Sequence, residues 1–449
     1  MKIFTESMSY RQYIKYLIPS VLTMVFLSFY TTIDGFFVSR YANTDALAGI
    51  NIVIPITCII FGTSIMLATG GGAIIGEYLG KEDVKKANET FTAISIVLLI
   101  LSLLFTIFGI IFLKPMAILL GTSERLMPHV LPYLFVVLAG AIPMSFKLFF
   151  EYMVRTDGNA KVGLKMSIVG LVLNVVLDYL FVGVLRYDTF GAALGTVLSI
   201  SASALIGLHH FLHYSNIHFA KPVFVFKTIL RSFTNGTGEM LTELSTGITT
   251  FLFNIIIMQK MGEDGIAAVT IIMYIYYFFI AFYMGISVTS APIISYNYGA
   301  NKLDRIKDTI KYSYISIVLT AIFIVITLYF GGDFIIRLFA NQQHVYELTV
   351  NALKYFSPVF IFIGINVFMS SYFTALGNGL IAAIISSLRS FILVVVYLIY
   401  LPTVFGNNGI WLSMPMAEIT TIVVSVFTYF KYGRRYFLES PSKESSLAN

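Results

Sequence analysis

Charged side chains are scarce in this 449-residue sequence, in which Asp, Glu, Lys and Arg make up 12% of the residues and hydrophobic types make up 57%. About a quarter of the residues of an average soluble domain are charged. So few charges cannot cover a surface that faces water on all sides, and the mean hydropathy is +0.85. The composition therefore indicates a polytopic membrane protein.

The sequence also has almost no cysteine and none of the common catalytic motifs. Cys58 is the only cysteine, which excludes an intrachain disulfide and a multi-cysteine metal site. The stretch GGGAIIGEYLG (70–80) has the small-xxx-small spacing of close helix packing and is not a Walker-type phosphate loop. No Ser/His/Asp or Cys/His arrangement reads as catalytic. We therefore expect a protein that is not an enzyme, has no cofactor or resident metal, and does not use ATP directly.

Long hydrophobic runs dominate what is present. A run of about 20 apolar residues crosses a bilayer core of roughly 30 Å as a helix. Twelve such spans are predicted near 14–38, 46–76, 91–113, 128–151, 163–185, 190–212, 234–259, 266–296, 312–331, 348–374, 380–402 and 409–431. The fold class expected is an all-α membrane protein with twelve transmembrane helices.

The basic residues predict the orientation of these spans. Cytoplasmic loops are enriched in Lys and Arg, and roughly two thirds of the 29 Lys and Arg residues fall on one side if the N-terminus is cytoplasmic. We therefore expect a multi-pass protein of the cell membrane with both termini in the cytoplasm. This distribution also accounts for the net charge of +6, so no nucleic-acid partner is expected.

Two halves of similar order follow one another along the chain. Gly80 and Gly299 are 219 residues apart, and the same offset relates Gly158 to Gly377. Six spans per half predict two pseudo-symmetric bundles, the N-lobe (1–213) and the C-lobe (233–449), around a central cleft and joined by a cytoplasmic linker (214–232). Parallel repeats that rock against each other are a transporter architecture.

Ionisable residues inside the spans are the candidates for function, because each one costs on the order of 2.5–3.5 kcal/mol at mid-membrane and needs a partner or a wet cavity. Asp34 lies in span 1, with Tyr30 on about the same helix face. Asn174 and Asp178 stack at i and i+4 in span 5, and Thr196 is the isolated polar group of span 6. Such oxygen ligands suit Na⁺, and two close carboxylates equally suit a proton. The alternative for Asp34 is an acid that simply reaches water near the outer helix end.

The second half has its own polar stripe. Span 7 carries Glu239, Glu243 and Asn254 on one face, and we expect Glu243 in particular to line a cavity. Glu418 in span 12 is either a further cavity acid or a paired residue. Two other groups have simpler explanations: Lys147 and Glu151 are spaced to neutralise each other, and Arg389 and Lys354 are expected to reach interfaces.

Several stretches together resemble the MATE (multidrug and toxic compound extrusion) family, in its bacterial DinF-like and MepA-like branches. They are TTIDGFFVSRY (31–41), LNVVLDYLFV (173–182), FGAALGTVLS (190–199), LTELSTGITTFLFN (241–254) and GIWLSMPMAE (409–418). The resemblance covers essentially the whole chain, and the order of the motifs is what makes it specific. No acid occurs in span 10, where some branches of the family carry one.

The resemblance implies a cation-coupled antiporter that exports organic cations and other amphiphiles by alternating access. It implies an N-lobe site for H⁺ or Na⁺ formed by Asp34, Asn174, Asp178 and Thr196, with Tyr30 beside it, and it makes Glu243 the acid of the C-lobe. The expected partners are small cationic substrates and membrane lipid, and we expect a monomer. The alternatives are a lipid-linked oligosaccharide or polysaccharide flippase of the same superfamily, and an uncoupled channel or receptor.

Overall fold

The computed structural model describes residue 4 and residues 8–41, 44–340 and 342–433, apart from the side chains of residues 31, 32, 34–36, 39 and 44. All elements in this described part are helical. The first half contains α2 (Tyr10–Tyr41), α3 (Thr44–Gly80), α4 (Val84–Ile111), α5 (Leu113–Leu119), α6 (Met127–Ala139), α7 (Ala141–Thr156), α8 (Ala160–Asp178), η1 (Tyr179–Val184) and α9 (Asp188–His213). The second half contains α10 (Phe226–Gly299), α11 (Leu303–Phe339), α12 (Gln343–Phe356), α13 (Val359–Ala375), α14 (Gly379–Ser387), η2 (Leu388–Ile392), α15 (Leu393–Phe405), α16 (Asn407–Thr428) and η3 (Tyr429–Gly433).

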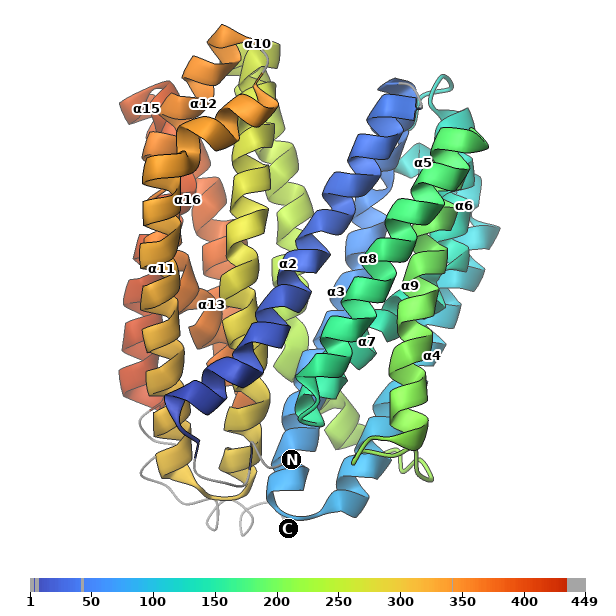
Figure 1. Ribbon diagram of the computed structural model, residues 1–449, viewed down its shortest axis with the longest axis vertical. Helices are drawn as coiled ribbons and strands as arrows, with labels where there is room; N and C mark the ends of the chain where they lie inside the picture. The colour runs from blue at the N-terminus through green and yellow to red at the C-terminus, as the bar shows by residue number, and fades with distance from the viewer. Residues whose placement is uncertain (1–3, 5–7, 42–43, 341, 434–449) are drawn as a thin grey trace.

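These helices satisfy their own backbone polar groups, as a chain in lipid must. Within the described residues, nine helices are long and apolar enough to span a membrane, and the bent pairs α6 with α7 and α12 with α13 can each form one more span. The 74-residue helix α10 counts as two spans, because its backbone is not helical at Gly262 and the chain turns back there (Figure 1). The described part thus accounts for the twelve predicted spans and confirms the fold class.

The two halves repeat each other in backbone detail. The fourth span is bent by 53° between α6 and α7, and its counterpart is bent by 51° between α12 and α13. Gly158 has φ +82° and Gly377 has φ +78°, a region that favours glycine. The two glycines are 219 residues apart and the two bends lie at nearly the same offset, which supports the internal repeat predicted from the sequence.

The helices form two groups that lie close together at one end and diverge toward the other (Figure 1). The first half makes up one group and the second half the other, as expected for an N-lobe and a C-lobe. Residues 214–225 lead from one to the other, and α10 begins at Phe226, so the last part of the expected linker is helical. The linker is held on α4, where Asn88 and Thr92 accept hydrogen bonds from the backbone N–H groups of His218 and Ala220.

Helix α2 runs diagonally across both groups (Figure 1). Near its start the Tyr13 hydroxyl lies 2.9 Å from Ser290 Oγ and 3.1 Å from Ser313 Oγ, both in the C-lobe. One turn later the Tyr16 hydroxyl donates to the backbone carbonyl of Arg155 in the N-lobe, at 2.7 Å. The first helix is therefore bonded to both lobes within a single turn.

The lobes are in close contact where α3 and α10 end, at Gly80 and Gly299. A side chain at Gly80 would clash with the carbonyl oxygen of Tyr296, and one at Gly299 would clash with that of Glu77. Each glycine thus lets its helix approach the backbone of the other lobe, the small-residue packing that membrane helices use. We call this end of the molecule the sealed end.

Candidate functional site

The predicted N-lobe site is built around the end of α8. Asn174 and Asp178 are fully buried there, and the Asn174 amide donates to Asp178 Oδ2 at 3.4 Å. Asp178 Oδ1 fills the space that a side chain at Gly195 of α9 would need. The next residue, Thr196, donates its hydroxyl to the backbone carbonyl of Ala192 at 3.0 Å. The structure therefore places Asp178 of the α8 pair against Gly195 of α9, the residue before Thr196.

Asp34 belongs to α2, but its side chain lies outside the described part of the structure. Helix α2 packs along α8, and Tyr30, one turn before Asp34, is buried with its hydroxyl against Gly170 and Ser203. Gly170 is one turn before Asn174 on α8, so Tyr30 lies beside the α8 pair as expected. The proximity of Asp34 to Asp178 stays a prediction.

A buried ion pair, formed by Lys147 and Glu151 of α7, lies close to the Tyr30 ring. Lys147 Nζ is 2.7 Å from Glu151 Oε2, and both side chains are almost completely buried in α7. Ser167 of α8 donates to the other carboxylate oxygen at 2.5 Å, and the ammonium lies 5.7 Å from the centre of the Tyr30 ring. The predicted mutual neutralisation of Lys147 and Glu151 is confirmed.

The acids of span 7 occupy different surroundings. Glu239 lines a cavity between the lobes. Glu243, one turn further along α10, packs near Gly62 of α3 and is not among the lining residues. Asn254 is exposed and also lies outside the lining. Our expectation placed Glu243 ahead of Glu239, whereas the described geometry gives the cavity position to Glu239.

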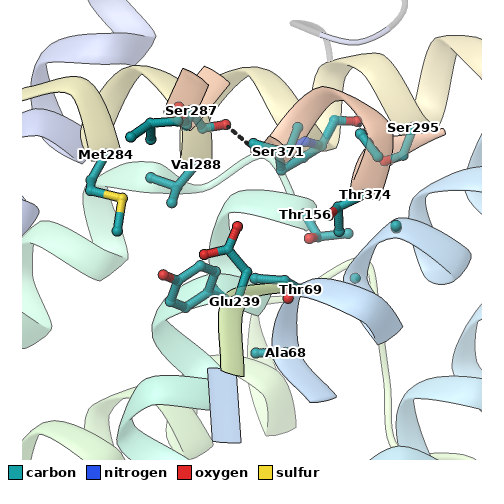
Figure 2. Close-up of a pocket in the computed structure, with 17 residues that line it drawn as sticks. Ala68, Thr69, Thr156, Glu239, Met284, Ser287, Val288, Ser295, Ser371 and Thr374 are labelled. Atoms are coloured by element: carbon teal, nitrogen blue, oxygen red, sulfur yellow. Dashed lines mark hydrogen bonds between the residues drawn. The ribbon is translucent and has the colours of Figure 1, made fainter. Parts of the chain in front are cut away.

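Both lobes contribute walls to this cavity. Thr69 of α3 and Tyr152 and Thr156 of α7 come from the N-lobe, and Ser287 of α10 and Thr374 of α13 come from the C-lobe. Figure 2 shows the Glu239 carboxylate pointing into the space between these walls. Sequence reasoning missed the polar lining residues other than Glu239, among them Tyr152, Ser287 and Thr374. Single hydroxyls in apolar helices most often bond to their own backbone, so no local pattern marks the ones that face a cavity.

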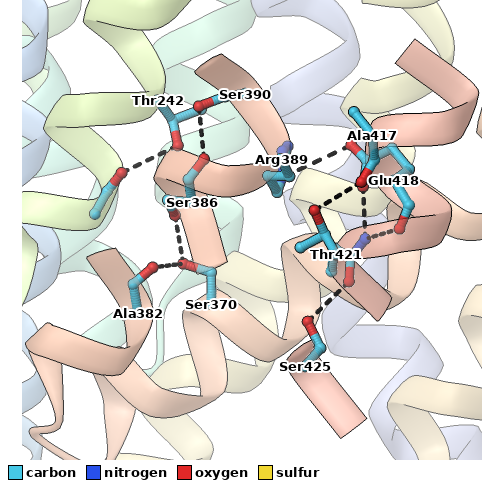
Figure 3. A network of polar contacts seen from close by, with 12 residues as sticks. Thr242, Ser370, Ala382, Ser386, Arg389, Ser390, Ala417, Glu418, Thr421 and Ser425 are labelled. Atoms are coloured by element: carbon cyan, nitrogen blue, oxygen red, sulfur yellow. Dashed lines mark hydrogen bonds and ion pairs between the residues drawn. The ribbon is translucent and has the colours of Figure 1, made fainter. Parts of the chain in front are cut away.

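Glu418 takes part in a paired network within the C-lobe (Figure 3). Its Oε2 accepts from the Asn366 amide at 2.7 Å, and its Oε1 lies 3.9 Å from Arg389 Nε. Asn366 in turn accepts from Ser425 at 2.8 Å. Glu418 is not among the residues that line the cavity. Of the two alternatives predicted from the sequence, a cavity acid or a paired residue, the structure therefore matches the paired residue.

The expectation that Arg389 reaches an interface is wrong. Its side chain is 5% exposed and lies in the π-helix η2 beside Glu418. The hydrophobic pattern of span 11 gives no sign that Arg389 is buried. The carboxylate that compensates its charge belongs to Glu418 of α16, which is distant in the sequence. Buried guanidinium groups persist when they are paired in this way.

A further buried carboxylate, Asp157, lies outside the membrane spans in the turn after α7. It accepts from His210 Nε2 at 2.8 Å, from the Asn159 amide at 2.7 Å and from the backbone N–H of Asn216 at 2.8 Å. Burial alone would raise the pKa of Asp157, but these hydrogen bonds outweigh it and hold the pKa below its ordinary value. The bonds fasten the end of α9 and the start of the linker to the N-lobe.

Two lobes of membrane-spanning helices, with a buried carboxylate site in one and a cavity between them, define a multi-pass membrane transporter. The MatE family model matches residues 19–180 and 240–400, and the chain belongs to this family. It is 23% identical over 448 residues to the multidrug export protein MepA of Staphylococcus haemolyticus (strain JCSC1435), with 98% of this chain and 97% of that protein covered. It is 25% identical over 421 residues to MepA of Staphylococcus aureus (strain MSSA476), with 92% of each covered.

A solved structure has the same fold. It is the outward-facing conformation of a multidrug resistance MATE family transporter of the MOP superfamily, with a TM-score of 0.88 at 21% identity and 95% of each chain covered. The family membership and this fold confirm the resemblance read from the sequence motifs.

Proposed function

We propose that this protein is a cation-coupled antiporter that exports organic cations and amphiphilic drugs. The observation that carries the proposal is the buried Asn174 and Asp178 pair inside the N-lobe, beside α2 and α9. Ionisable groups at this depth are costly and mark ion pathways. The MepA relatives are named as multidrug export proteins, which supports the same class of substrate here.

The coupling ion binds, in this proposal, among Asp34, Asn174, Asp178 and Thr196. Carboxylate, amide and hydroxyl oxygens are hard ligands that suit Na⁺, and a pair of close carboxylates suits a proton because both cannot ionise cheaply. A membrane potential supplies about 2.3 kcal/mol per charge per 100 mV. One cation moving inward therefore drives appreciable accumulation of substrate outside.

Transport follows from alternating access of the space between the lobes. We place the sealed end at the cytoplasm, because the short loops there carry most of the Lys and Arg residues. With the lobes together at that end, substrate leaves to the outside while the ion binds the N-lobe. Substrate enters after the lobes have parted at Gly80 and Gly299.

The flippase alternative is disfavoured by the charge of the cavity. A lipid-linked pyrophosphate needs basic groups, whereas Glu239 is the only charged side chain among the described lining residues. An uncoupled channel or receptor has no need of a buried, ionisable carboxylate such as Asp178.

The test is dye uptake into inverted vesicles driven by an ion gradient. We expect ethidium accumulation to follow either a pH jump or a Na⁺ jump, which identifies the ion. Asp178→Asn should abolish that accumulation while the protein still reaches the membrane in normal amounts. Glu347→Gln, at an exposed carboxylate on α12, is the control and should transport normally. Undiminished uptake by Asp178→Asn would overturn the coupling role.

A further inference from the structure

A run of exposed apolar side chains lies where the linker enters α10. Val223, Phe224, Val225 and Phe226 follow one another in the sequence, and their exposed fractions lie between 45% and 78%. Consecutive apolar side chains are unfavourable on a loop that faces water, because none of their surface is removed from it. The run therefore indicates that this part of the linker lies against something other than water.

The run is attached to the protein on both sides. Before it, Phe219 packs on Phe91 of α4 with ring centres 5.0 Å apart, and the Ala220 N–H donates to Thr92. After it, Arg231 of α10 forms the ion pair with Glu77 near the end of α3. These two attachments hold the run at the sealed end of the molecule and leave its side chains uncovered.

The backbone of the run indicates how deep it lies. Residues 218–225 form no helix, and no hydrogen bond in the described part of the chain involves the backbone N–H groups of Val223 and Phe224. The hydrocarbon core of a bilayer does not tolerate such unpaired groups, whereas water reaches them in the headgroup layer. Apolar side chains on such a backbone suit the boundary between headgroups and acyl chains.

Two lysines flank the apolar run. Lys221 precedes it and Lys227 follows it, both are exposed, and neither forms an ion pair with any residue that the structure describes. A lysine close to an anionic membrane surface strengthens the attraction about fivefold. The two ammonium groups therefore favour phospholipids with a net negative charge over zwitterionic ones.

We propose that residues 221–227 are a binding site for anionic phospholipid. Phe224 and Phe226 insert among the acyl chains of the adjacent leaflet, and Lys221 and Lys227 pair with lipid phosphates. None of these residues lines the cavity between the lobes or belongs to the N-lobe ion site, so the inference goes beyond the proposed antiport and does not depend on it. It attaches the segment that joins the two lobes to the membrane surface.

The experiment identifies the lipid that lies next to residue 224. Phe224→Trp is reconstituted in vesicles of equal parts phosphatidylcholine and phosphatidylglycerol, in which one lipid or the other carries bromine atoms near the headgroup end of its acyl chains. Bromine quenches tryptophan fluorescence on contact. The unmodified protein gives the background, because its single tryptophan, Trp411, is 2% exposed. We expect brominated phosphatidylglycerol to quench the variant at least about twofold more than brominated phosphatidylcholine.

Further variants identify the source of this preference. Lys221→Gln with Lys227→Gln, added to Phe224→Trp, should remove the preference and leave quenching by both lipids, because the apolar side chains still insert. Lys302→Gln with Lys311→Gln changes two exposed lysines at the start of α11, and this matched control should keep the preference. Phe323→Trp, at an exposed position within α11, should be quenched equally by both lipids.

The outcomes that would overturn the site are distinct. Quenching by aqueous iodide, without quenching by either brominated lipid, would place the segment in water. Equal quenching by the two lipids at low salt would show an apolar contact that does not recognise charge. A preference that survives Lys221→Gln with Lys227→Gln, or that does not weaken as salt screens the charges, would exclude the lysines as its source. The thermal unfolding midpoint of each variant shows that it is folded.

Discussion

Arg231 of α10 and Glu77 of α3 form an ion pair between the halves, with Nη2 and Oε2 2.9 Å apart. Lys81, in the same half as Glu77, contacts the other oxygen of that carboxylate at 2.6 Å. Glu77 is thus shared between a partner in its own lobe and a partner in the opposite one. Of these two contacts, only the one with Arg231 links the two lobes.

Replacing Arg231 should therefore favour separation of the lobes at the sealed end. Arg231 is well exposed, and exposed ion pairs contribute about 0.2–1 kcal/mol, so Arg231→Gln should shift the ratio of closed to open populations by a few fold. Distances between spin labels on the two lobes report that ratio. Lys81→Gln removes a charge from the same carboxylate within one lobe, and an equal shift in that variant would contradict the role of Arg231.

The glycine contacts at the sealed end predict a larger effect. Gly80→Ala should destabilise the closed arrangement by about 1–3 kcal/mol, because its new methyl group meets the backbone of Tyr296 and the helices must move apart. Thermal unfolding in detergent measures the loss. Gly331→Ala is the control, since no atom lies within 4 Å of a side chain added at Gly331. A Gly80→Ala protein as stable as Gly331→Ala would refute the close contact.

The Asp157 hydrogen bonds predict a loss of stability in acid. Because the pKa of Asp157 is lowered in the folded protein, its contribution is complete above the ordinary Asp value of about 4 and is lost as the pH falls through the lower folded pKa. The unfolding midpoint of the unmodified protein should exceed that of Asp157→Asn at pH 7, and the difference should narrow toward pH 3. A difference that stays constant over this range would exclude the carboxylate as its source.

The buried pair of Arg389 and Glu418 predicts that removing one charge costs more stability than removing both. Arg389→Met leaves the Glu418 carboxylate buried without its cation, which should cost about 3–5 kcal/mol. Adding Glu418→Gln removes the uncompensated charge, so the double variant should recover much of that loss, since Asn366 can still bond to the amide. Unfolding midpoints of both single variants and the double variant complete the cycle. Purely additive losses would show that the two charges do not interact.

The features that could be predicted from the sequence are those set by hydrophobic periodicity and by short spacings between residues. The twelve spans, the two repeated halves and the Lys147 with Glu151 pair all depend on residues close in sequence, and the structure confirms them. The surroundings of Arg389 and Glu239 depend on which distant helices pack against them. Nothing in span 11 identifies Glu418 as a neighbour, and nothing in span 7 shows that Glu239 faces α7 and α13. The position of Asp34 relative to Asp178 stays a prediction.

The bonds made by the start of α2 have a consequence for how the protein is made. Tyr13 is among the first residues synthesised, but its partner Ser290 follows 277 residues later. At about 5–20 residues per second, that partner emerges roughly 15–55 s after Tyr13. The first helix is therefore synthesised well before its N-terminal half can form its final hydrogen bonds with the second half of the chain. Its placement is completed only when the second half of the chain arrives.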